Sequence, residues 1–147
     1  MTRRIRAPRE AVYRALLDAK AIAAWRVPVG MTCVVQEFDA REGGSFRISL
    51  SYVDSARAGK TGGHTDTYHG HFVRLVPNAQ VVEVLEFESV NPELQGKMTQ
   101  TTTLADADGA TEVTVAHEGI PRGVSVADNE TGTRMALDNL AALVERR

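Results

Sequence analysis

The chain has 147 residues, of which 43% are hydrophobic and 24% charged, and its formal net charge is −2 at pH 7. These values are typical of a single globular domain over residues 1–147 and give no reason to expect nucleic acid or an anionic membrane as partner. We expect a soluble, cytoplasmic protein. Cys33 is the only cysteine, no signal peptide is visible, and no apolar run approaches the roughly 18 residues of a membrane span.

The N-terminal part predicts a short strand followed by two short helices. The strand covers residues 2–6, and Pro8 then suits the first position of a helix because its fixed φ is helical and its missing N–H is not needed there. A second helix is expected over about 20–25, stopped before Pro28 and Gly30.

The middle of the chain predicts about six antiparallel strands. Apolar and polar residues alternate from Ser45 to Tyr52, so we expect one face of that strand to be buried and the other to be exposed to solvent. Gly43 and Gly44 supply the positive φ of a tight turn, across which Asp39 and Arg41 can pair. A long loop over 54–66 could form a flap over an entrance. The strands are expected over 33–38, 44–52, 67–76, 80–88, 96–105 and 111–118.

A single long helix is expected over 125–145. Ser125 and Asp128 approximate a capping box at its start. Gly132 costs about 1 kcal/mol relative to alanine in a helix interior, and close approach to the sheet would explain it. The sheet must bury one face, and this helix is the element able to cover it. The prediction is an α+β helix-grip (START-like) fold, in which a curved antiparallel sheet of six to seven strands wraps a long C-terminal helix and leaves a ligand cavity between them.

The chain resembles homologues of the activator of the heat-shock protein 90 ATPase, in the SRPBCC superfamily (START-like, birch-pollen-allergen-like). The motifs that carry the resemblance are Ile5-x-Ala7-Pro8, Asp39-x-Arg41-x-Gly43-Gly44-x-Phe46, Val113-Thr114-Val115-x-His117-x-Gly119 and Gly132-x-x-x-Ala136-Leu137. The resemblance implies a helix-grip fold and a cavity more firmly than catalysis. Many relatives carry tryptophan directly after the helix glycine, whereas Thr133 stands here and would enlarge or wet the cavity.

The expected ligand is a small, largely apolar molecule, because the side chains in phase with the cavity are mainly aromatic and aliphatic. Core packing is the alternative role for each of them. The ligand-binding candidates are Trp25, Phe46, Ile48, Leu50, Tyr52, Phe87, Met98, Val113, Val115, His117, Thr133 and Leu137.

Three polar residues are candidates for catalysis. His117 shares phase with Val113 and Val115, so it can point into the cavity as a general base or ligand contact, or be a satisfied core histidine. Glu83 is in phase with Leu85, although a bulge would turn it outward. Tyr68 is the third candidate.

We expect no metal and no cofactor. His69, His71 and His64 could supply three nitrogens to zinc, but no cysteine or carboxylate stands at a diagnostic spacing. Walker and dinucleotide-binding motifs are also missing from the sequence.

Three hypotheses of function remain, in order of preference. The first is a binding protein for a small hydrophobic ligand. The second is an enzyme of the cyclase, dehydratase or hydrolase kind, in which His117 works with Glu83 or Tyr68, and whether the chain is an enzyme stays open. The third is a protein-interaction module like the co-chaperone, although nothing in the sequence supports a chaperone partner. A homodimer through the sheet edge or the long helix is also left open.

Overall fold

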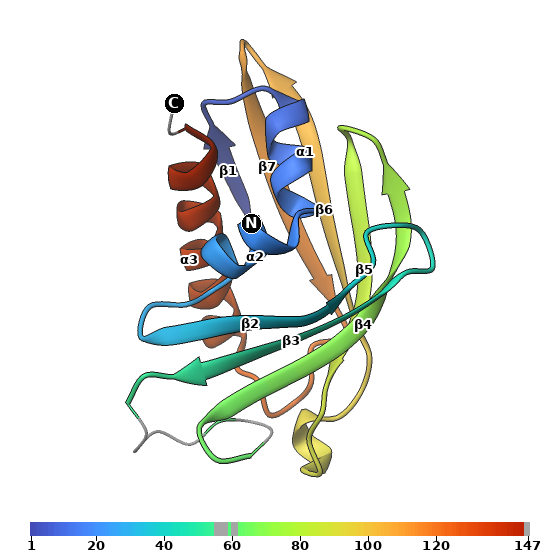
Figure 1. Ribbon diagram of the computed structural model, residues 1–147, viewed down its shortest axis with the longest axis vertical. Helices are drawn as coiled ribbons and strands as arrows, with labels where there is room; N and C mark the ends of the chain where they lie inside the picture. The colour runs from blue at the N-terminus through green and yellow to red at the C-terminus, as the bar shows by residue number, and fades with distance from the viewer. Residues whose placement is uncertain (55–58, 60–61, 146–147) are drawn as a thin grey trace.

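The computed structural model describes residues 1–54, 59 and 62–145 and folds them into one antiparallel sheet with α-helices on one side (Figure 1). The strand order is β1-β7-β6-β5-β4-β3-β2, so β1 and β2 form the two edges. The strands are β1 (Thr2–Ile5), β2 (Met31–Phe38), β3 (Ser45–Tyr52), β4 (Thr65–Val76), β5 (Gln80–Phe87), β6 (Met98–Ala107) and β7 (Ala110–Glu118). The helices are α1 (Arg9–Leu16), α2 (Ala19–Trp25), the 3₁₀ helix η1 (Pro92–Leu94) and α3 (Val126–Glu145).

This architecture confirms the predicted α+β helix-grip fold. Two short helices follow the first strand, the long helix α3 runs beside β1, and β2, β3 and β4 cross the lower part of the view (Figure 1). The backbone of α3 comes close to β1, α1 and α2. None of the helices in the described part of the chain is long and apolar enough to cross a membrane.

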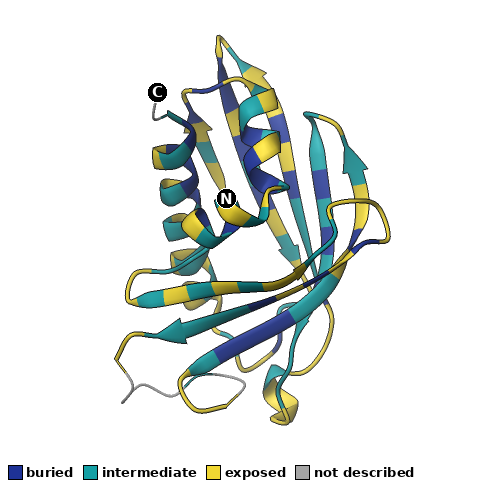
Figure 2. Cartoon of the chain, in the orientation of Figure 1, coloured by how far each residue is buried: buried dark blue, intermediate teal, exposed yellow. Residues whose placement is uncertain are grey.

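The buried residues form one core between the inner face of the sheet and the helices (Figure 2). Helix α3 contributes Leu137, Leu140, Ala141 and Val144, which recur at helical spacing, while its first residue, Val126, is exposed. The helix therefore packs through its C-terminal half.

The helix starts follow from local hydrogen bonds. Pro8 has an extended ψ of 157° and is the N-cap of α1, so its prediction as the first helical residue was wrong by one position. The Asp18 carboxylate caps α2 by accepting hydrogen bonds from the backbone N–H groups of Lys20 and Ala21. At α3, the Asp128 N–H donates to the Ser125 hydroxyl oxygen over 3.0 Å, as expected for a capping residue.

The β2–β3 turn has part of the chemistry that its sequence predicts. The positive φ expected of Gly44 is wrong, and a Cβ at this position would instead overlap the Asp39 carbonyl oxygen. Arg41 Nε donates to Asp39 Oδ2 over 2.7 Å, and Gly43 has a φ of +80°. The Gly43 N–H donates to the Phe72 carbonyl oxygen over 2.8 Å, which ties the turn to β4. The motif is thus architectural.

The long loop expected over 54–66 lies partly outside the described residues. Strand β4 already begins at Thr65, two residues before its predicted start. Irregular pairing between Phe72 and Arg74 shifts the register of β4 against β5, and a similar shift occurs between Val35 and Glu37 of β2.

Two glycines show where backbones approach closely and where they do not. A Cβ on Gly132 would have no atom within 4 Å outside the local helix, so the expected close contact of this glycine with the sheet is wrong. A Cβ on Gly70 would overlap the Val84 carbonyl oxygen and stand 2.8 Å from Leu85 Cα. Close backbone packing therefore occurs between β4 and β5.

We predict opposite effects for alanine at these two positions. Gly132→Ala raises the free energy of unfolding by about 1 kcal/mol, because alanine favours the helix and meets no neighbour. Gly70→Ala lowers it by about 2 kcal/mol, because the new Cβ would displace the β5 backbone. Urea denaturation followed by circular dichroism measures both, and an equal change in the two variants would contradict the packing described.

Candidate functional site

A cavity of about 460 Å³ lies between the inner face of the sheet, helix α3 and the end of α2. Its volume falls within the range of about 300–1,000 Å³ that is usual for small-molecule sites. Much of its wall is apolar and comes from every layer of the fold. The apolar lining residues include Leu16, Trp25, Met31, Leu50, Leu85, Phe87, Met98, Val115, Leu137 and Leu140.

Most of the residues predicted to bind a ligand line this cavity. They are Trp25, Leu50, Tyr52, Phe87, Met98, Val115, His117, Thr133 and Leu137. Phe46, Ile48 and Val113 lie instead in the closed core, each at most 1% exposed. These three share strand faces with lining residues but stand farther along their strands, beyond the cavity.

Polar side chains form one row across the sheet. The pairing register sets Glu83 of β5 opposite Gln100 of β6, and Gln100 opposite His117 of β7. Side chains in directly paired positions on one face are neighbours. The Gln100 amide N–H donates to Glu83 Oε2 over 3.1 Å, and Gln100 Oε1 lies 2.8 Å from His117 Nε2.

Arg26 completes this row from the end of α2. Its Nη1 donates to Glu83 Oε1 over 2.8 Å, and the side chains of the pair are only 13% and 5% exposed. The Asn139 amide of α3 donates to the carbonyl oxygens of Trp25 and Val27, on either side of Arg26. The Trp25 indole N–H donates to the Ala15 carbonyl oxygen over 2.9 Å. The backbone that carries Arg26 is therefore fixed by α1 and α3.

The protonation states of Arg26 and Tyr68, which both line the cavity, are well defined. Burial alone lowers the pKa of Arg26, but the adjacent Glu83 carboxylate outweighs this effect and the pKa is raised overall. Burial raises the pKa of Tyr68 to about 12, against the opposing effect of Arg26. The Arg26 guanidinium carbon lies 5.6 Å from the centroid of the Tyr68 ring. Arg26 is thus charged and Tyr68 is protonated at neutral pH.

His117 is a neutral imidazole with an assignable tautomer. Burial lowers its pKa, and the positive charge of Arg26 lowers it further. Because the Gln100 amide nitrogen is bound to Glu83, the oxygen faces His117, so Nε2 carries the proton and donates it. Nδ1 then accepts a hydrogen bond from the Asn129 amide over 3.3 Å.

The structure also decides which face the other candidates occupy. Glu83 points inward, and both of its oxygens already accept hydrogen bonds from Arg26 and Gln100. His69 lies on the opposite face of the sheet, where its ring nitrogens are 2.9 Å and 3.2 Å from carboxylate oxygens of Glu88 and Glu86. His71 is exposed on the same outer face, so these histidines do not reach the cavity.

Sequence reasoning missed Arg26, Gln100 and Asn129 as members of the site. An arginine at a helix end is most often a solvated charge, and Gln100 lies in a threonine-rich strand that suggests a surface. Only the alternation that places Gln100 in phase with Met98 and Thr102 could have indicated its inward direction.

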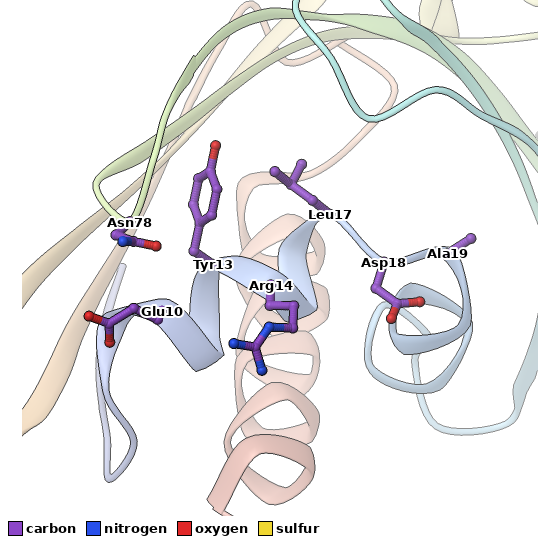
Figure 3. Close-up of a pocket in the computed structure, with 7 residues that line it drawn as sticks. All are labelled: Glu10, Tyr13, Arg14, Leu17, Asp18, Ala19 and Asn78. Carbon is purple, nitrogen blue, oxygen red and sulfur yellow. The ribbon is translucent and has the colours of Figure 1, made fainter.

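A second hollow, of about 590 Å³, lies between α1, the start of α2 and the β4–β5 turn at Asn78 (Figure 3). In Figure 3, Tyr13 and Leu17 project in the same direction from α1 and its C-terminal end. Charged side chains such as Arg14 lie beside them. Glu10 and Asp18 in its rim are exposed, and it contains none of the predicted site residues. The cavity under α3 is therefore the candidate site.

Comparison with known proteins identifies the family. Residues 6–145 match the model of the family described as "Activator of Hsp90 ATPase homolog 1-like protein". The chain belongs to this family. The SRPBCC superfamily, which contains it, typically binds small ligands.

Solved structures agree with this assignment. The crystal structure of protein CV1439 from Chromobacterium violaceum is 33% identical, with a TM-score of 0.91, and the match covers 100% of this chain and 96% of that one. A protein from Rhodobacter sphaeroides is 19% identical, with a TM-score of 0.80 and coverage of 98% and 89%, and shares the fold. No curated protein matches the sequence at a significant level.

In this member of the Hsp90-activator-like family, we predict that the buried ion pair is essential for stability. Glu83→Gln lowers the free energy of unfolding by about 3 kcal/mol, because it leaves the Arg26 charge buried without its counter-ion. The matched control Glu93→Gln removes an exposed pair with Arg122 and changes stability by less than about 1 kcal/mol. Urea denaturation measures both, and equal effects would show that burial of the pair has no consequence.

We also predict a pH dependence that originates at His117. Folding lowers the pKa of this group below its ordinary 6.5, so its contribution to stability is present above that value and is lost as the pH falls below it. From about pH 7 to about pH 5, the wild type should lose more unfolding free energy than His117→Gln does. Nuclear magnetic resonance titration of the imidazole should give a midpoint below 6.5. A midpoint above 6.5 would contradict the neutral state.

Proposed function

We propose that this protein binds a small, mainly apolar molecule in the cavity between the sheet and α3. The observation that carries the proposal is the lining itself, in which aliphatic, aromatic and methionine side chains stand beside polar ones such as Arg26, Gln100 and His117. Burial of apolar ligand surface against such walls contributes roughly 25 cal/mol per Å². The family assignment supports the same class of function.

The small residues of α3 favour binding over simple packing. Gly132, Thr133 and Ala136 all line the cavity, where larger side chains on this helix would fill it. The Thr133 hydroxyl donates to the Asn129 carbonyl oxygen over 2.8 Å, so its polar atom is used within the helix. The methyl group of Thr133 then adds apolar surface beside the space that a ligand would occupy.

Native mass spectrometry of freshly purified protein is the direct test of this proposal. A discrete additional mass that disappears on denaturation would identify a bound molecule and its size. If the mass is that of the chain alone, dialysis against an added apolar probe decides whether the cavity accepts a ligand.

We predict that Thr133→Trp prevents binding without unfolding the protein. The indole would occupy the cavity beside Gly132, so affinity for 2-ethylnaphthalene should fall by at least about tenfold in equilibrium dialysis. The control Thr103→Trp places the same side chain on the exposed outer face of β6 and should bind like the wild type. Equal affinities in the two variants would place the probe outside this cavity.

A further inference from the structure

Tyr68 presents a hydrogen-bonding group to the cavity. Its side chain is 5% exposed and lines the cavity, and edge-to-face contacts with Phe46 and Phe87 hold its ring in place. Among the described residues, no group forms a hydrogen bond with its hydroxyl, and the hydroxyl is not sealed against solvent. Tyrosine hydroxyls in buried surroundings usually have a partner, so this one is available to water or to a ligand atom in the cavity.

Arg26 stands beside this hydroxyl-bearing ring with donors to spare. A guanidinium carries five N–H donors, and within the described part of the chain only Glu83 accepts from it, through Nη1. Its carbon lies 5.6 Å from the Tyr68 ring centroid, and both residues line the cavity. Two kinds of donor, an O–H and an N–H, therefore face the same corner.

The charge balance around Arg26 favours a neutral ligand acceptor over a charged one. Glu83 already neutralises Arg26 over 2.8 Å, so a ligand carboxylate would share one buried positive charge with a second carboxylate. A neutral oxygen avoids that repulsion. With its pKa near 12, Tyr68 stays protonated and remains a donor at neutral pH.

We propose that Arg26 and Tyr68 form a subsite for a neutral carbonyl oxygen on an otherwise apolar ligand. The two lone pairs of a carbonyl oxygen match the two donors. A ketone, an ester and an amide share this chemistry. This inference rests on the proposed function, since it concerns the orientation of a ligand within the same cavity.

Three probes with one ring system test the subsite. They are 2-acetylnaphthalene, with a neutral carbonyl, 2-naphthoate, with a carboxylate, and 2-ethylnaphthalene, with no acceptor. Equilibrium dialysis should show that the wild type binds the ketone about three- to tenfold more tightly than the hydrocarbon, and the carboxylate most weakly. Tyr68→Phe should reduce the preference for the ketone, because only the Arg26 donor remains, and leave affinity for the hydrocarbon unchanged. Tyr13→Phe, outside the cavity, should bind like the wild type.

The outcomes separate this inference from the proposed function. Equal binding of ketone and hydrocarbon by the wild type, or tightest binding of the carboxylate, would overturn the carbonyl subsite and leave the apolar cavity intact. Failure of all three probes to bind would overturn both. If Tyr68→Phe does not fold, the carbonyl carbon resonance of labelled ketone decides. A downfield shift on binding to the wild type supports the subsite, and a resonance like that in apolar solvent overturns it.

Discussion

The ion pair between Arg26 and Glu83 links the helical layer to the middle of the sheet, and the geometry of the site depends on it. Two charges taken out of water destabilise a fold unless their contacts are well aligned. The surrounding structure meets this condition from several directions. Asn139 fixes the peptide groups around Arg26, Gln100 engages the second oxygen of Glu83, and His117 continues the row. The pair thus joins the end of α2 to β5 and to the polar row, and it balances the Arg26 charge in the cavity wall.

A division between closed core and open cavity runs along the inner face of the sheet. Phe46 and Ile48 support the sheet, whereas Leu50 on the same strand face borders open volume. This division arises because α3 approaches the sheet closely at the β1 edge, while its N-terminal half carries small residues such as Gly132. The closed core, which stabilises the fold, and the cavity therefore occupy different parts of the same face of the sheet.

The periodicity and turn chemistry of the sequence predicted the fold well, because those signals are local. The alternation in 45–52 and the turn around Asp39 and Gly43 both correspond to observed elements. The polar row could not be predicted, since it depends on which residue of β5 pairs with which residue of β6, and pairing register is a long-range property. Gly132 was misinterpreted for a related reason, because a helix glycine can mark either close contact or open space.

The pairing of β1 with β7 has a consequence for how the chain folds. Thr2 lies opposite Thr114, and the N-terminal amino group donates to the Val115 carbonyl oxygen, a contact between residues 114 positions apart. Such non-local pairings form late, because the entropy cost of closing a large loop comes before the favourable contacts are made. The hairpins from β2 to β5 can form before β1 pairs with β7. Helix α3 packs beside β1 at that edge of the sheet. The β1 edge and the contact of α3 with it are therefore expected to be completed late, so the N-terminal residues contribute more to slowing unfolding than to accelerating folding.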